Sequence, residues 1–172
     1  MLSKVLIVDF GSQVTQLIAR SVRSQKVYCE VIPYNKVSLN YIKNEKPLGI
    51  ILSGSPLSVT KKGFPKVKKE IFLLGIPILG ICYGMQLISS VLGGRIKKIS
   101  GREYGDTSIK VLKKSSVSPN NWKINTNHNV WMSHGDSVKK LPKNFISFAK
   151  SNNENFAGIA NEKMKIFGLQ FH

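Results

Sequence analysis

The first half of the chain alternates between short apolar runs and segments with helical spacing. Residues 4–9 form a continuous apolar run, as expected for a buried parallel strand. Residues 13–24 carry apolar side chains at the spacing of one helix face. The same two patterns predict strands over 27–32, 49–52 and 76–82 and helices over 65–74 and 85–92. This alternation predicts right-handed βαβ units and a largely parallel sheet covered by helices on both faces.

After Gly94 the pattern changes to short strand-like runs separated by turns. These runs comprise residues 95–99, 107–112, 122–126, 146–149, 156–160 and 166–171. They predict a strand-rich second half that adds antiparallel strands to the same domain. The expected fold class is therefore α/β, with one domain over residues 1–172 and a central mixed sheet.

Composition supports a single soluble domain. The 172 residues include 42% apolar residues, and the longest apolar stretch, residues 71–79, is interrupted by Gly75 and Pro77. This stretch is far shorter than the ~20 residues of a membrane span. The N-terminus runs directly into a strand-like segment, so we expect no signal peptide. Two cysteines make no disulfide framework, and a reducing cytoplasm is the simplest compartment.

The net charge of +17 raises the question of an acidic partner. Only four of the 26 basic residues are arginines, whereas a surface built to bind phosphates bidentately would use more. The densest lysine cluster, residues 61–69, contains one aromatic residue. We therefore expect a solvated lysine-rich surface and no specific nucleic acid partner. The chain has no Walker loop, dinucleotide fingerprint or zinc-finger spacing, so no cofactor or metal is expected.

Residues 80–86, Gly-Ile-Cys-Tyr-Gly-Met-Gln, have the pattern of a nucleophile elbow. A buried strand enters this segment and a helix leaves it. Glycines two positions before and after Cys82 let neighbouring backbone approach closely. The helix N-terminus is expected to lower the pKa of the thiol, whose thiolate is the attacking species. The alternative is a structural cysteine buried at a tight turn.

This motif resembles the nucleophile motif of class I (triad) glutamine amidotransferases. Tyr83 and Met85 give it the form found in the amidotransferase domain of GMP synthases. Further blocks resemble the same family in the same order, at residues 7–20, 50–54, 101–105, 130–136 and 167–172. The resemblance implies a three-layer, flavodoxin-like domain with a mostly parallel central sheet. It also implies a glutaminase that supplies ammonia to an ATP-pyrophosphatase (GMP synthetase). Either a separate subunit supplies that synthetase, or the chain is a remnant of a longer gene.

The resemblance also assigns roles to individual residues. Cys82 and His172 match the catalytic cysteine and histidine. Backbone N–H groups of Ser55 and Tyr83 would form the oxyanion hole. The other matches would line the glutamine pocket, namely Gly54, Gln86, Ser133, His134, Gly135 and Asp136.

Two departures from the family pattern bear on activity. Ser55 stands where the family usually has glycine, and a positive φ there would strain a serine by ~1 kcal/mol. The family's histidine is followed by proline and then by the triad glutamate, which is absent from these 172 residues. We expect His172, as the last residue, to be poorly held. The chain is thus either a glutaminase or a catalytically impaired remnant or interaction module.

Five other residues invite a functional interpretation. His134 is a possible substitute base, although the family pattern places it in the substrate loop. We interpret His128 as a solvated loop residue and Cys29 as a buried apolar residue. Trp131 and Met132 are expected to lie in the core.

Overall fold

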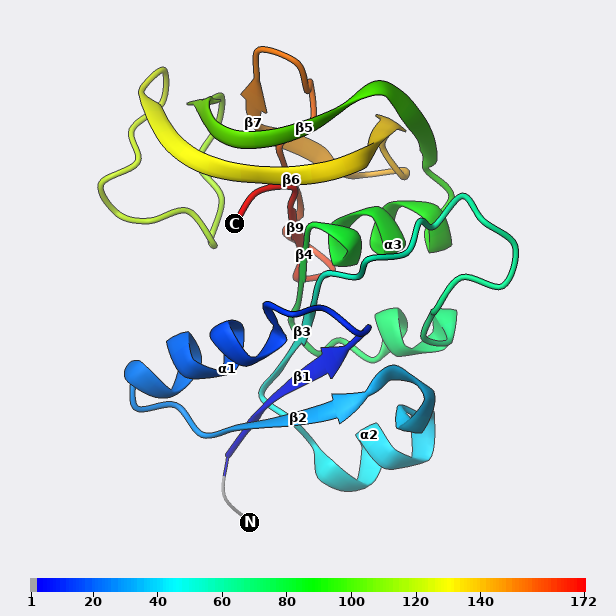
Figure 1. Ribbon diagram of the computed structural model, residues 1–172. Coiled ribbons are helices and arrows are strands. Elements are labelled where there is room, and N and C mark those ends of the chain that lie inside the picture. Colours follow the sequence, from blue (N-terminus) through cyan, green and yellow to red (C-terminus); the bar gives the residue numbers. More distant parts are fainter. Residues whose placement is uncertain (1–2) are drawn as a thin grey trace.

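The structure, a computed structural model, describes residues 3–172, apart from the side chains of residues 100–102. The first two residues, on which the expectation of no signal peptide partly rests, lie outside this range. The described residues form one nine-stranded sheet in the order β2-β1-β3-β4-β9-β8-β7-β5-β6 (Figure 1). Within residues 3–172, no helix is long and apolar enough to cross a membrane.

One half of the sheet is parallel, as the alternation of elements predicted. Neighbouring strands run parallel from β2 through β1, β3 and β4 to β9. The elements of this half are β1 (Val5–Asp9), α1 (Thr15–Ser24), β2 (Cys29–Pro33), η1 (Tyr34–Lys36), α2 (Leu39–Glu45), β3 (Gly49–Leu52), η2 (Lys69–Leu73), β4 (Ile78–Ile81), α3 (Tyr83–Val91) and β9 (Ile166–Leu169). The strand predictions for this region are confirmed to within a few residues.

Helices lie on both faces of the parallel half, giving three layers. Residues of α2, η2 and α3 form one core with the side chains that β1 and β3 turn to that face, such as Leu6 and Leu52. On the opposite face α1 packs Ala19 against Ile7 and Cys29. Half-buried residues of β3, β4 and β9 on this second face line a cavity instead of meeting a helix. Coverage on this face is therefore less complete than the sequence predicted.

The other half of the sheet is antiparallel. It contains β5 (Arg95–Val111), β6 (Asn127–Lys140), β7 (Ile146–Ser151) and β8 (Gly158–Asn161), and β8 pairs with β9 to join the two halves. β5 and β6 form a long curved pair at the top of Figure 1. The runs 95–99 and 107–112, predicted as two strands, are parts of β5, whose register shifts between Lys98 and Glu103.

Several sequence predictions were wrong. Residues 65–68 are not helical: Pro65 and Val67 are buried while Lys66 and Lys68 are exposed, which is the alternation of an extended chain, and only the 3₁₀ helix η2 follows. Residues 122–126 are turns, not a strand, because Asn125 adopts a φ of 69° before β6 begins. The helix α2, capped by the Ser38 side chain, and the whole of β6 were not predicted.

Candidate active site

Cys82 occupies a strained turn between β4 and α3. Its φ and ψ are 54° and −105°, a conformation that non-glycine residues rarely adopt. Its N–H donates to the carbonyl of Leu169 at 2.6 Å, which holds the turn to β9. A Cβ atom on Gly84 would lie 2.3 Å from the Leu52 carbonyl oxygen, and one on Gly80 would lie 2.4 Å from the backbone of Gly84. Close packing, rather than positive φ, therefore demands glycine at both positions.

The thiol of Cys82 is buried, and burial dominates its ionisation. Burial raises the pKa of Cys82 to about 11, although the Tyr83 N–H and the Gln170 side chain both act to lower it. The sequence led us to expect a lowered pKa from the helix terminus. That expectation is wrong for the free chain, because the residue is only 7% exposed and desolvation outweighs the two hydrogen bonds that favour the thiolate.

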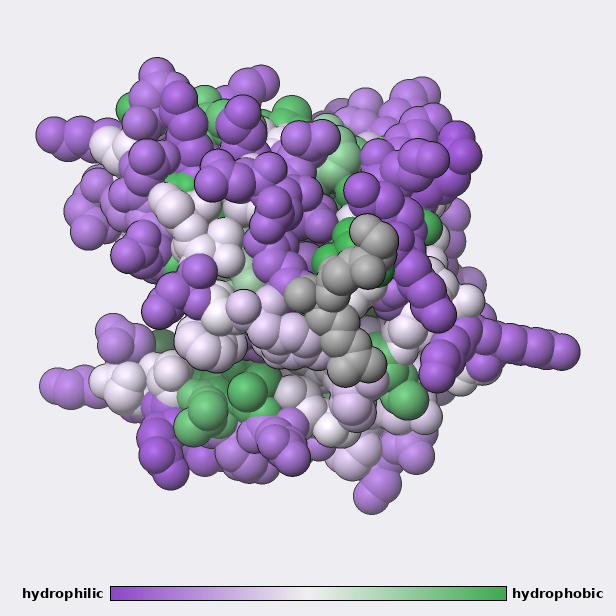
Figure 2. All heavy atoms as spheres, turned by 45° about the horizontal axis from the view of Figure 1, so that its top comes forward, coloured by the Kyte–Doolittle hydropathy of each residue, from purple (hydrophilic) through white to green (hydrophobic). Residues whose placement is uncertain are grey.

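Cys82 lines two cavities. The larger, about 870 Å³, lies between α1 and the uncovered strands and is also lined by His172. The smaller, about 580 Å³, is lined by Cys82 and by most of the residues expected to bind glutamine, namely Ser55, Tyr83, Gln86, Ser133, His134, Gly135 and Asp136. Gly54 lines the larger cavity. Figure 2 shows a largely hydrophilic surface that is hollowed at the left between the upper and lower parts of the molecule.

His172 is held by its backbone. Its N–H donates to the Trp131 carbonyl at 2.8 Å, and the Trp131 N–H donates to the His172 carbonyl at 3.3 Å. The expectation of a poorly held chain end is therefore wrong for the backbone. Surrounding protein atoms, and secondarily the charge of His134, lower the pKa of the His172 imidazole. Within the described part of the chain, that imidazole forms no hydrogen bond or ion pair with another side chain.

A hydrogen-bonded chain connects the thiol to residues 133–136, which the sequence analysis expected in a loop and which lie within β6. Gln170 donates to Cys82 Sγ at 3.6 Å, and its Oε1 accepts from Gln86 Nε2 at 3.2 Å. Gln86 Nε2 also donates to the Asp136 carbonyl at 2.8 Å, and the thiol itself donates to the Ser133 carbonyl at 3.5 Å. Gln170 was not among the residues selected from the sequence. Its position two residues before His172, within a block that resembles the family, was the available signal.

The contacts of His134 do not suit a free catalytic base. Its side chain is 1% exposed, Nδ1 bonds to the Asp136 carbonyl at 3.0 Å, and Nε2 lies 3.2 Å from Glu103 Oε2. Nδ1 is thus hydrogen-bonded to Asp136, Nε2 faces Glu103, and neither nitrogen is hydrogen-bonded to Cys82, which does not favour the alternative of His134 as a substitute base. Glu103 was also missed as a site residue, although it lies in the matching block 101–105.

The turn after β3 is unstrained at Ser55. This residue is not among those with a positive φ, so the strain considered for a serine at this position does not arise. Its Oγ accepts from the Leu57 N–H at 3.2 Å. The buried Ser53 accepts from the Phe10 N–H at 3.2 Å and so ties the turn to the end of β1.

Of the remaining sequence expectations, two are confirmed and two are wrong. Met132 is fully buried and Cys29 is 2% exposed, as expected. Trp131 is 52% exposed and is not a core residue. His128 lies in β6, half-buried and stacked on Trp122 with ring centroids 4.7 Å apart, so it is not a solvated loop residue.

Comparison with known proteins identifies the family. The sequence profile described as "Glutamine amidotransferase class-I" matches residues 6–172. The chain belongs to the class I glutamine amidotransferase family. It is 48% identical over 171 residues to a glutamine-hydrolyzing GMP synthase of Brachyspira hyodysenteriae and 48% identical over 168 residues to one of Brucella melitensis. These matches cover 99% and 98% of the chain but only 32% and 33% of the relatives, so the chain spans about a third of their length.

Solved structures show the same amidotransferase fold. A candidate GMP synthase subunit of Thermoplasma acidophilum superposes with a TM-score of 0.80 at 24% identity, covering 100% of this chain and 84% of that one. A glutamine amidotransferase of Thermotoga maritima gives a TM-score of 0.71 at 23% identity, with coverages of 100% and 76%. At these identities the likeness supports the fold alone.

Proposed function

We propose that this amidotransferase chain hydrolyses glutamine to glutamate and ammonia through a thioester on Cys82. The observation that carries the proposal is the elbow itself. A cysteine with a φ of 54° is held there by the Leu169 carbonyl, at the start of a helix, between two cavities. A purely structural cysteine has no need of such a conformation, and strain of ~1–3 kcal/mol is typical of functional turns.

The polar cavity suits the side-chain amide of glutamine. Its lining includes residues 133–136, Ser55 and Gln86, beside the first turn of α3. The substrate carbon would lie against Cys82 Sγ, and its oxygen would accept from the N–H groups of Tyr83 and Ser55. These donors stabilise the oxyanion that forms as sulfur attacks the carbonyl carbon.

Proton transfer would fall to His172. The imidazole takes the thiol proton as sulfur attacks and returns it to the departing nitrogen, which leaves as ammonia. Water then cleaves the γ-glutamyl thioester to glutamate, with the same imidazole as base. Because the pKa of the free Cys82 thiol is raised to about 11, substrate and base together must generate the nucleophile at neutral pH.

A second candidate is an impaired amidotransferase-like module. It is favoured by the His172 imidazole, which has no side-chain partner within residues 3–172 to fix its tautomer. Loss of the orienting acid costs ~10⁴-fold in a serine protease, and a thiol depends less on base assistance. We therefore expect slow turnover from a polypeptide of these 172 residues alone.

The test is glutamate release from glutamine by the 172-residue polypeptide. A second polypeptide carries the additional proline and triad glutamate of the family pattern and is expected to be faster by orders of magnitude. Cys82→Ser should abolish release in both, while Cys29→Ser should leave it unchanged. Equal turnover with and without the extension would exclude impairment, and release that survives Cys82→Ser would exclude the thioester.

The ammonia acceptor is proposed to be a GMP synthetase of the ATP-pyrophosphatase type. Support comes from the Thermoplasma protein, which is named as one subunit of a GMP synthase, and from the GMP synthases that match this chain over about a third of their length. Co-purification with such a synthetase, and ammonia-dependent against glutamine-dependent formation of GMP, test this assignment.

A further inference from the structure

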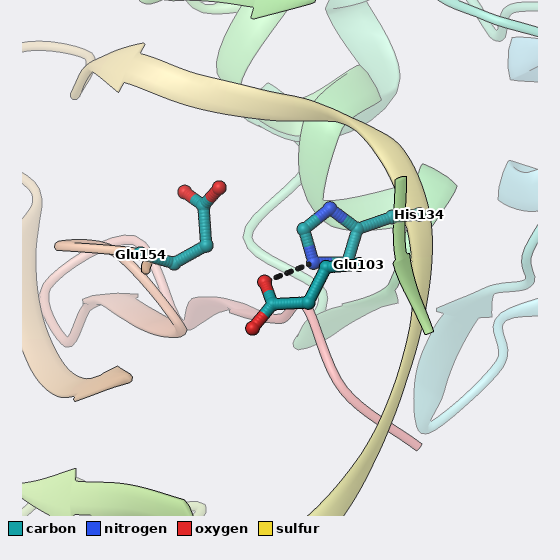
Figure 3. A group of neighbouring side chains, drawn as sticks. All are labelled: Glu103, His134 and Glu154. Atoms are coloured by element: carbon teal, nitrogen blue, oxygen red, sulfur yellow. Dashed lines mark ion pairs between the residues drawn. The ribbon is translucent and has the colours of Figure 1, made fainter. Parts of the chain in front are cut away.

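Three ionisable side chains from separate segments meet in the antiparallel half of the sheet. Glu103 comes from β5, His134 from β6, and Glu154 from the connection between β7 and β8 (Figure 3). One ligand atom from each lies within 4.8 Å of the other two. The side chains of His134 and Glu103 are 1% and 8% exposed, and Glu154 is 3% exposed. Such a buried group requires compensation for its charge.

Two buried ligand atoms of His134 and Glu103 face each other without a hydrogen bond. A carbonyl can only accept, so the bond between Nδ1 and the Asp136 carbonyl places a proton on Nδ1. Nε2 lies 3.2 Å from Glu103 Oε2, a contact that is an ion pair when the imidazole is protonated and a metal-ligand spacing when it is neutral. The contact lacks hydrogen-bond geometry, and neither buried atom has another hydrogen-bond partner. A metal cation between these atoms would give both of them a partner and would take the place of the proton on Nε2.

The spacing fits ligands of a tetrahedral metal ion. With bonds of about 2.0–2.1 Å, two ligand atoms on a tetrahedral zinc ion lie about 3.3 Å apart. The Nε2–Oε2 distance of 3.2 Å agrees with this edge. Glu154 completes the triangle within 4.8 Å, so its carboxylate needs to approach by about 1–1.5 Å to coordinate.

The surroundings supply supporting contacts but little positive charge. Glu103 Oε1 accepts from Asn153 Nδ2 at 3.1 Å, which orients the carboxylate as an outer partner of a ligand would. Burial raises the pKa of Glu154 to about 7 against the lowering effects of the Ser137 hydroxyl and the charge of Lys97, and the charge of Glu103 adds a smaller upward shift. Lys97 is itself exposed, so its compensation is weak. A divalent ion would neutralise both carboxylates directly.

We propose that Glu103, His134 and Glu154 bind one divalent transition-metal ion, with Zn²⁺ as the best match. A neutral imidazole with two carboxylates suits zinc, whereas Mg²⁺ and Ca²⁺ take oxygen ligands. The ion would cross-link β5, β6 and the β7–β8 connection. His134 and Gln86 share the Asp136 carbonyl, so the ion would also steady the part of β6 that contacts Cys82. Its role is structural, and it is independent of the proposed hydrolysis.

The first test is a calorimetric Zn²⁺ titration of the untagged, metal-free chain. Cys82→Ser is used as the background so that the thiol cannot bind the ion. We expect one ion per chain, and at least ~10-fold weaker binding after Glu154→Gln, since even outer partners of a metal cost that much. Glu162→Gln is the matched control, because Glu162 accepts from Ser115 and Ser116 away from the cluster, and it should bind as the background does. Mg²⁺ should give no heat.

The second test uses Co²⁺ with the unsubstituted chain and does not depend on how any variant folds. Nitrogen and oxygen ligands give visible d–d absorption without the near-ultraviolet charge-transfer band of a cobalt thiolate. That spectrum, unchanged by Cys82→Ser, is the expected result. Absence of binding, a thiolate band that Cys82→Ser removes, or equal Zn²⁺ affinity in folded Glu154→Gln would each overturn the proposal.

Discussion

The two cysteines of this chain are almost equally buried, yet their surroundings differ completely. Cys29 is 2% exposed in a regular strand, packs with Ile7 and Ala19 under α1, and donates to the Ala19 carbonyl at 3.6 Å. Cys82 is 7% exposed, has a φ of 54° and lines two cavities. Burial therefore does not separate the packing cysteine from the proposed nucleophile, whereas backbone conformation and adjacent empty space do.

The largest expected difference between them is in covalent labelling. A diazo-ketone glutamine analogue that binds the polar cavity is held beside Cys82, and such positioning yields very large effective concentrations. We expect Cys82 to react at least ~100-fold faster than Cys29 in peptide mass spectrometry.

Iodoacetamide is the control for this experiment, because it has no glutamine-shaped group. It should give a smaller ratio of Cys82 labelling to Cys29 labelling than the glutamine analogue does. Label found chiefly on Cys29 would contradict the assignment of Cys82 as nucleophile.

The next test adds one methyl group to the tightly packed turn that holds Cys82. In Gly84→Ala the new Cβ would lie 2.3 Å from the Leu52 carbonyl oxygen, which is backbone and cannot rotate away. We expect a loss of about 3 kcal/mol in the free energy of unfolding, measured by urea denaturation, together with loss of Cys82 labelling. Gly63→Ala is the control: its φ of 75° costs ~1 kcal/mol but nothing lies within 4 Å. Equal losses for the two variants would contradict the packing argument.

Much of this elbow was visible in the sequence, and the reason is local. A strand, a tight turn and a helix occupy adjacent residues, so the spacing of Gly80, Cys82 and Gly84 carries the geometry directly. The parallel strands were predictable for a similar reason, because each is a short apolar run that ends at a turn.

The second half was harder because its contacts are distant in sequence. Trp131 is hydrogen-bonded to His172, and Glu103 contacts His134. The residues of each pair lie far apart in the sequence, and no local pattern predicts that they meet. β6 lies in a polar, histidine- and asparagine-rich stretch without an apolar alternation strong enough to predict it. The pKa of Cys82 was misjudged for a further reason, since desolvation depends on the whole fold while the helix terminus is visible locally.

A smaller effect is expected in the pH dependence of stability. Folding raises the pKa of Cys82 to about 11 from an ordinary value near 9, so the folded state holds the thiol proton more tightly. This stabilisation is complete below pH 9 and is lost as pH rises through 11. Between pH 8 and 11 the unsubstituted chain should lose on the order of 2 kcal/mol more than Cys82→Ser, which has no titrating group there. Parallel stability curves for the two proteins would show that the thiol is not desolvated.

The smallest effect is expected at the other cysteine. Cys29 acts as a small apolar residue in a strand, where valine has a similar size and a higher strand propensity. Cys29→Val should change the free energy of unfolding by less than about 1 kcal/mol, because only a weak S–H donor to Ala19 is lost. The same substitution at Cys82 places a β-branched residue at a φ of 54° and should cost about 1–3 kcal/mol. Thermal and urea unfolding of both variants give the comparison directly. Similar costs at the two positions would mean that the backbone at Cys82 relaxes without strain, and the elbow would then no longer distinguish the reactive cysteine from the structural one.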